Sequence, residues 1–167
     1  MKNDAAIVMA AMQQIRLKFT DDQTNDIKTI VVAAVRQKGE VLRYMSQEMK
    51  DDATIVMAAV LQDGRALEHA WEGMKNDVTI VQAGVQQDGR ALEHAGEVMK
   101  NDATIVRAAV QQNGRALEHA GEEMKNDVTI VRAAVQQLRR YGNGGRIDNW
   151  LASIDVPEAV RHDALTK

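Results

Sequence analysis

The chain has 167 residues, a formal net charge of −3 and no cysteine. The lack of cysteine excludes disulfides, thiolate metal sites and cysteine catalysis, and the slight acidity argues against a surface made as a whole for nucleic acid or anionic lipid. No run approaches the roughly 18 consecutive apolar residues of a membrane-spanning helix. Residues 1–4 are a poor start for a signal peptide, so we expect a soluble, intracellular protein without membrane contact.

The first 25 residues contain a degenerate copy of a unit that repeats later in the chain. Asp4 and Ile7 stand where the later copies have Asp and Ile, but the glycine of those copies is missing between residues 11 and 25. Repeat arrays generally need an atypical terminal unit with a polar outer face. We therefore predict an N-terminal capping repeat over residues 1–25.

Residues 26–137 repeat with a period of 25 residues, which is typical of solenoids whose units bury their apolar faces only against their neighbours. The period is marked by Ile30, Ile55, Ile80, Ile105 and Ile130, and by Gly39, Gly64, Gly89 and Gly114. We predict an all-α fold, an α-solenoid of roughly five helix-turn-helix repeats with irregular terminal caps.

Each repeat is predicted to contain two helices. In the unit over residues 52–75, Asp52 suits an N-cap, and the following apolar stripe predicts a first helix over 54–62. Gly64 suits a left-handed exit from that helix, and a second helix is expected from about residue 65 to 75. We expect the same N-cap role for Asp26, Asp77, Asp102 and Asp127.

Residues 138–167 do not follow the period. Glycines over 142–145 indicate a break. Beyond it, Ile147, Trp150 and Leu151 have helical spacing, and Pro157 suits the first turn of a helix over 158–165. Two interpretations stay open: a C-terminal cap with Trp150 folded onto the last repeat, or a mobile docking tail.

The repeated unit resembles the short helical repeats of DUF4116, a family of unknown function. The match is carried by Asn101-Asp102, Ile105-Val106, Ala108-Ala109-Val110, Gln112, Gly114, Ala116-Leu117 and Ala120, and the resemblance covers about residues 26–137. It implies a tandem helical array without an established activity. The family often has an aromatic residue where this chain has His69, His94 and His119, and only Tyr44 keeps it here.

Those histidines form a ladder with one residue per repeat. Zinc needs nitrogen ligands at about 2.0–2.1 Å, whereas helices of neighbouring repeats are expected about 8–10 Å apart. Glu72, Glu97 and Glu122 are expected beside these histidines, three residues later on the second helix. A single active site would break the period, which argues against these Glu–His pairs as acid–base catalysts. We predict a structural ladder, and no catalytic, cofactor-binding or metal-binding residue.

Positions at which the repeats differ from one another are the candidates for binding specificity. One register of the first helix, opposite the Ile–Val stripe, changes from apolar to basic along the chain: Val32, Met57, Gln82, Arg107 and Arg132. On the second helix, Trp71 stands where other copies have Ser46, Gly96 and Gly121. Trp71 either fills a groove or is an exposed anchor for a partner, since Trp is enriched in binding hot spots.

The leading hypothesis is a non-enzymatic scaffold or protein–protein interaction module whose partner, another protein, contacts Met57, Trp71, Gln82, Arg107 and Arg132. One alternative is an architectural subunit or fragment of a larger assembly. Another is weak nucleic-acid binding through Arg107, Arg132, Arg139, Arg140 and Arg146, although helical repeats that read RNA use stacking aromatics and only 3% of this chain is aromatic. The sequence makes no prediction of the oligomeric state.

Overall fold

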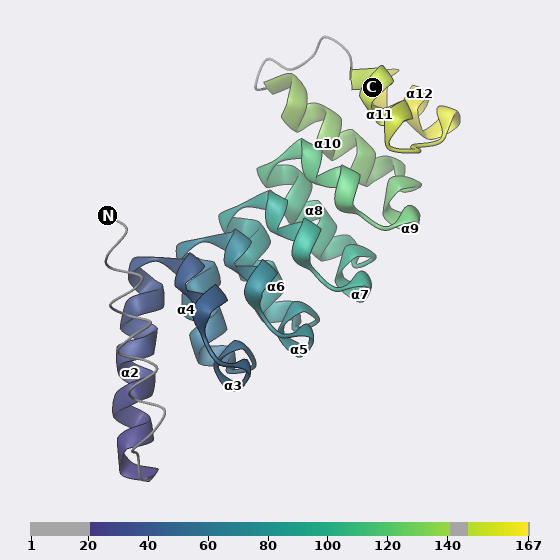
Figure 1. Ribbon diagram of the computed structural model, residues 1–167. Coiled ribbons are helices and arrows are strands. Elements are labelled where there is room, and N and C mark those ends of the chain that lie inside the picture. The colour runs from purple at the N-terminus through teal and green to yellow at the C-terminus, as the bar shows by residue number, and fades with distance from the viewer. Residues whose placement is uncertain (1–20, 141–146, 167) are drawn as a thin grey trace.

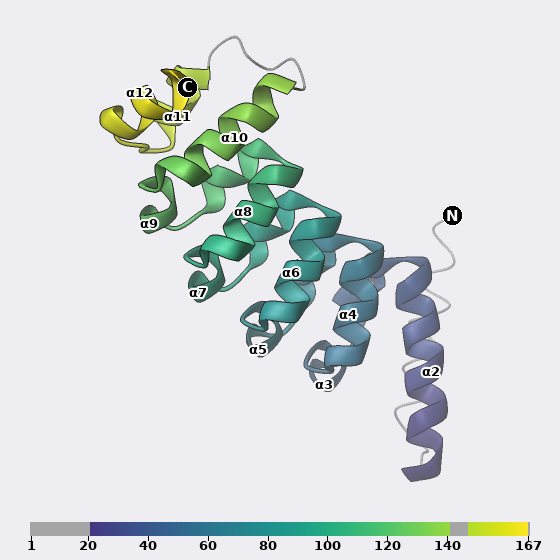
Figure 2. The same cartoon turned by 180° about the vertical axis from the view of Figure 1, so that it is seen from behind.

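The computed structural model describes residues 21–140 and 147–166, and within these ranges the chain is helical without strands (Figure 1). The predicted α-solenoid is confirmed. Its first helices lie side by side in one row, and each contacts the next (Figure 2). They are α2 (Asp21–Gln37), α4 (Ala53–Gln62), α6 (Val78–Gln87), α8 (Ala103–Gln112) and α10 (Val128–Arg140).

The aspartate caps are confirmed in four repeats. The side chain of Asp102 accepts hydrogen bonds from the N–H groups of Thr104 at 2.8 Å and Ile105 at 3.0 Å. Asp52, Asp77 and Asp127 make the same pair of bonds. The prediction was wrong for Asp26, which lies inside α2. Asp26 is one residue out of register, because the position 25 residues before Asp52 holds Ile27, whose side chain cannot accept a capping hydrogen bond.

The second helix is not continuous, contrary to the prediction. Each unit has a 3₁₀ helix followed by one short α-helical turn, with an extended backbone at Ala70 and Trp71 between them. The Trp71 N–H donates to the carbonyl oxygen of Lys50 at 2.9 Å, and thus bonds to the preceding repeat instead of its own helix. The 3₁₀ helices are η1 (Gly39–Tyr44), η2 (Gly64–His69), η3 (Gly89–His94) and η4 (Gly114–His119), and the short turns are α3 (Gln47–Lys50), α5 (Glu72–Lys75), α7 (Glu97–Lys100) and α9 (Glu122–Lys125).

The repeat glycines lie where the backbones of two neighbouring repeats come close together. Gly39, Gly64, Gly89 and Gly114 all lack a positive φ, so the predicted left-handed exit is wrong. A Cβ atom at Gly39 would lie only 2.6 Å from the carbonyl oxygen of Ala59, in the next repeat. The Gly114 N–H also donates to Gln137 Oε1 at 2.8 Å. Glycine is therefore required because another backbone passes directly over it.

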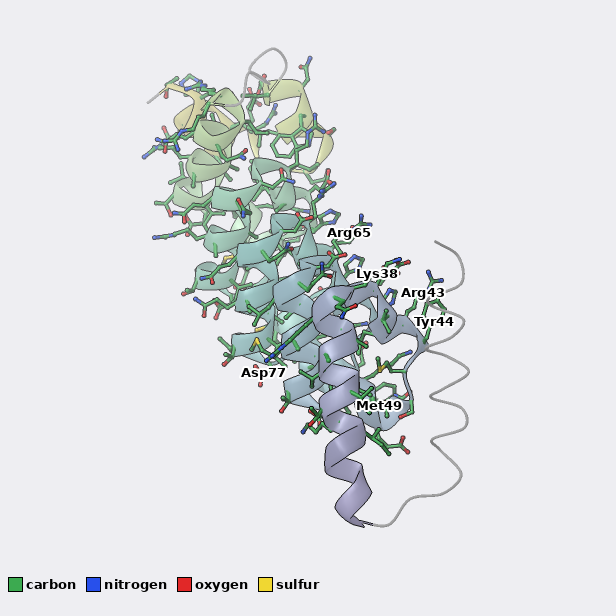
Figure 3. All side chains as sticks on the ribbon, turned by 90° about the vertical axis from the view of Figure 1, so that its left-hand side faces the viewer. Lys38, Arg43, Tyr44, Met49, Arg65 and Asp77 are labelled. Atoms are coloured by element: carbon green, nitrogen blue, oxygen red, sulfur yellow. The ribbon has the colours of Figure 1, made fainter. Side chains whose placement is uncertain are left out.

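The core is one continuous seam of Ile, Val, Leu and Ala along the array, and it contains no polar residue among those described. Among the described residues no repeat covers α2, and Ile30 on this helix is 57% exposed, whereas Ile105 at the same register is 0% exposed. Figure 3 looks onto this α2 end. The predicted capping repeat over residues 1–25 lies mostly outside the described residues.

The C-terminal end is covered by two further helices, α11 (Ile147–Ser153) and α12 (Glu158–Thr166). Helix α12 packs on α10, and Ile147, Leu151 and Ala164 are buried. Trp150 is partly buried against the core. The predicted glycine break over 142–145 lies outside the described residues. None of the described helices combines the length and apolar character that crossing a membrane requires.

Candidate interaction surface

The five residues of the variable register lie along one side of the row of first helices, which we call the outer face. Val32 and Met57 are half-buried and pack against the core, and Gln82 is also half-buried. Arg107 is exposed on α8. The register therefore forms a line across the array, as its helical spacing predicts, although its apolar members also contribute to packing.

Arg132 is at the same register but faces the chain itself. Its Nη2 donates to the Asp163 carbonyl oxygen at 3.3 Å, and Arg139 Nη2 donates to the Leu165 carbonyl oxygen at 2.9 Å. Both acceptors are in the last turn of α12, where carbonyl groups lack helical partners and carry partial negative charge. Of the two arginines in the variable register, Arg107 is exposed, whereas Arg132 binds the C-terminal helix.

The sequence interpretation missed Leu61, which is 62% exposed. Leu61 follows Met57 by one helical turn on α4, so both side chains lie on the outer face. The equivalent residues are polar in all other described repeats, namely Arg36, Gln86, Gln111 and Gln136. This break in the repeat was visible in the sequence and has the same form as the one at Met57.

Trp71 is 47% exposed. At the equivalent Gly96, a Cβ atom would collide with the side chain of Asn76 from the preceding repeat, and Gly121 has the same relation to Asn101. Twenty residues before Trp71, at the register of Asn76 and Asn101, the chain has Asp51 instead of asparagine. Trp71 and Asp51 therefore both differ from the residues that form the Gly–Asn contact in the two following repeats.

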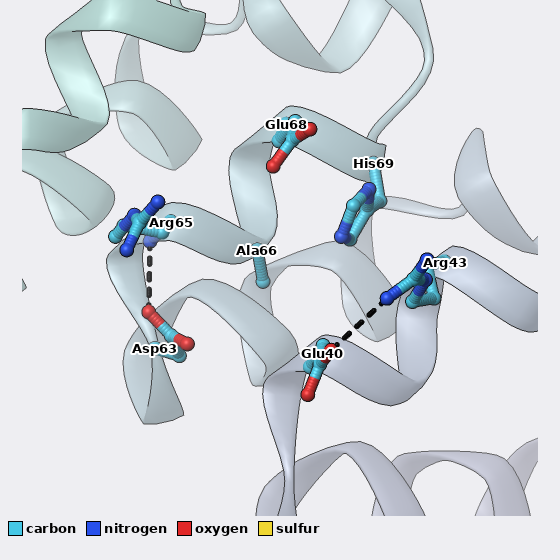
Figure 4. A pocket seen from close by; sticks show the side chains of 7 residues that line it. All are labelled: Glu40, Arg43, Asp63, Arg65, Ala66, Glu68 and His69. Carbon is cyan, nitrogen blue, oxygen red and sulfur yellow. Dashed lines mark hydrogen bonds and ion pairs between the residues drawn. The ribbon is translucent and has the colours of Figure 1, made fainter.

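The histidine ladder lies on the opposite side, along the 3₁₀ helices. A shallow pocket between η1 and η2 is lined by Glu40, Arg43, Asp63, Arg65, Ala66, Glu68 and His69 (Figure 4). One pair of opposite charges in it is neutralised, because Arg43 donates to Glu40 at 3.1 Å, and Asp63 accepts from the backbone N–H of Arg65 at 3.0 Å. Among the described residues, no three His, Cys, Asp or Glu side chains are grouped to hold a metal ion.

The expected acidic neighbours of the histidines were the wrong ones. His119 Nε2 lies 3.2 Å from Glu118 Oε1 and 3.9 Å from Glu93 Oε2 of the preceding repeat. Glu122 instead pairs with Lys125 at 3.3 Å, as Glu72 and Glu97 pair with Lys75 and Lys100. The spacing rule for a continuous helix fails here because the extended residues before each short turn separate the two segments.

Acidification from about pH 7.5 to 5.5 is expected to destabilise the protein. Burial lowers the pKa of His69 and His94 below the 6.5 of an exposed histidine. The unfolded chain then binds more protons, so the stability present above pH 6.5 falls as the pH drops towards the folded-state pKa. Urea unfolding across this range measures the effect. The variant His69→Gln/His94→Gln should flatten the pH dependence, and an unchanged slope would contradict the assignment.

Copied helical units that share one continuous core define an α-solenoid repeat protein. The family model described as Domain of unknown function (DUF4116) matches four overlapping segments, residues 28–70, 52–100, 77–125 and 102–141. These matches span more than half of the chain, which belongs to this family, and the resemblance stated from the sequence is confirmed. Comparisons with curated proteins and with solved structures find no match.

Proposed function

We propose that the chain is a non-enzymatic helical-repeat module that binds another protein through the outer face. The observation that carries this proposal is a graded change of side-chain chemistry along that face within a copied frame. At the central register, Met57, Gln82 and Arg107 succeed one another, whereas the buried residues keep one chemistry from repeat to repeat.

The opposite side supports this choice of face. The segment Gly-Arg-Ala-Leu-Glu-His is identical in η2, η3 and η4, so the exposed side of the 3₁₀ helices presents the same groups three times. Stacking accounts for the small and apolar members of that segment. Packing gives no reason for the outer face to change from apolar to neutral to basic, whereas recognition of a partner does.

The test is cross-linking and co-purification from cells that express the protein. In the variant Met57→Glu/Arg107→Glu, we expect partner proteins to be lost. The control Arg115→Glu changes an exposed arginine of η4 and should retain them. Partners that survive the outer-face variant, or that disappear only with the control, would contradict this face.

Nucleic-acid binding through the C-terminal arginines is the second candidate. Arg107 and Arg140 are exposed, but Arg132 and Arg139 bind α12, and Arg146 lies outside the described residues. Anisotropy titration with a single-stranded oligonucleotide over a salt series tests it, because phosphate contacts weaken steeply with salt. An architectural role in a larger assembly would instead be revealed by the mass of the native particle.

A further inference from the structure

One repeat differs from its copies at one half-buried and two exposed positions. Met57, Leu61 and Trp71 form what we call the α4 apolar cluster. In the next repeat the same positions hold Gln82, Gln86 and Gly96, and in the one after that Arg107, Gln111 and Gly121. The fold therefore tolerates polar or small residues at each position, so packing within the array does not require the cluster.

Two of the three side chains lie on one helix, and the backbone of the third residue is close to the start of that helix. Met57 and Leu61 lie one turn apart on the outer face of α4. Trp71 is beside the N-terminal end of α4, because its N–H bonds Lys50, three residues before the helix begins. Large apolar side chains left partly exposed together mark a site of association, and Trp in particular is enriched in binding hot spots.

The charge of the outer face is opposite to that of the whole chain. The net charge is −3, yet α4, α6, α8 and α10 contain neither Asp nor Glu. At the registers of Met57 and Leu61, the charged residues on the described first helices α2, α6 and α8 are Arg36 on α2 and Arg107 on α8, whereas Asp51 and Glu72 are exposed near Trp71. The glutamates of the central repeats lie instead on the 3₁₀ helices and the short turns. A partner segment that complements this face carries carboxylates.

The chain already contains one contact of this kind. Helix α12 places the electronegative end of its backbone against Arg132 and Arg139 of α10, while Ala164 is buried. Arginines of the first helices thus hold a helix that combines an apolar side with partial negative charge. Arg107 is the exposed equivalent of Arg132 one repeat earlier.

We propose that the outer face binds an amphipathic acidic helix, with apolar residues on the α4 apolar cluster and carboxylates near Arg36 and Arg107. This inference rests on the proposed function and specifies its partner. Neighbouring helices are about 8–10 Å apart, so Leu61 and Arg107 are separated by roughly 16–20 Å across two repeats. A helix rising 1.5 Å per residue covers that span with about 11–13 residues.

The probe is a labelled synthetic peptide of about 16 residues, helical, with leucines on one face and glutamates elsewhere. Anisotropy titration with the full chain should give a Kd that weakens at least tenfold in Met57→Gln/Leu61→Gln/Trp71→Ser. Each replacement stands at the same position in another repeat, as Gln82, Gln86 and Ser46, so the fold should be retained, and circular dichroism verifies this. Arg107→Gln should weaken binding severalfold, and added salt should do the same. The control Arg115→Gln should leave the Kd unchanged.

A peptide with lysine in place of glutamate should bind at least tenfold more weakly. Equal or tighter binding of the lysine peptide would overturn the proposal, as would wild-type affinity in the triple variant. Tighter binding of a single-stranded oligonucleotide than of the acidic peptide would also overturn it. If the acidic peptide fails while Met57→Glu/Arg107→Glu still removes cellular partners, only the partner chemistry is wrong. If those partners also persist, the proposed function fails with it.

Discussion

Gly89→Ala is expected to lower the free energy of unfolding by about 3 kcal/mol, at the upper end for overpacking. The new Cβ atom would collide with the carbonyl oxygen of Ala109 and lie 3.1 Å from the Asn113 backbone nitrogen. Both obstacles are backbone atoms, so relief requires moving one repeat away from the next. Urea unfolding followed by circular dichroism measures the change.

Gly84→Ala is the matched control. A Cβ atom there would meet its nearest neighbours at 3.5–3.9 Å, and Ala59, Ala109 and Ala134 occupy the same register. Because Gly84 is inside α6, this change should raise the free energy of unfolding by about 0.5–1 kcal/mol. If Gly89→Ala proves neutral or stabilising, close approach is not what requires glycine at this position.

These two glycines show how far the period predicts the fold. It correctly predicted the first helices, their aspartate caps and the stacked core, because these depend on spacing within about ten residues. The position of the glycine in each unit was also correct, but the left-handed helix exit predicted for it was wrong. The constraint on Gly89 comes from Ala109, twenty residues later, and becomes visible only when the repeats are stacked.

The same limit explains the errors at the second helix. Residues 65–75 have good helix-forming composition, but Trp71 uses its N–H on the preceding repeat, and the helix is interrupted there. The assignment of Glu72 as the neighbour of His69 failed for this reason. Hydrogen bonds between repeats outweigh the local helix propensity of this segment. The sequence pattern does not reveal these bonds, because it is the same as that of a continuous helix.

For the candidate surface, the sequence identified the register that varies, but it did not indicate that Val32, Met57, Gln82 and Arg132 of this register are half-buried. It could not show that α12 covers Arg132, because the contact joins residues 31 positions apart and lies outside the repeat frame. The sequence interpretation did not include Leu61, although Leu61 is apolar where the other described repeats have a polar residue, because Leu61 lies one helical turn away from the variable register. The structure adds its 62% exposure and its place next to Met57.

Ile105→Ala is expected to lower the free energy of unfolding by about 2–5 kcal/mol, the usual cost of emptying a buried isoleucine site. Ile105 is 0% exposed between neighbouring repeats. Ile30 is the same residue type at the same register, but it is 57% exposed on α2. Ile30→Ala should therefore cost less than about 1 kcal/mol, because most of its side chain already contacts water.

Urea unfolding of the two variants compares an interior repeat with the first helix of the described array, while residue type and helical register stay constant. A large loss in Ile30→Ala would contradict the exposure of this side chain and show that α2 is covered in solution. Repeating the measurement over a range of protein concentrations then identifies the cover, since stabilisation by a second molecule depends on concentration whereas a cover from the same chain does not.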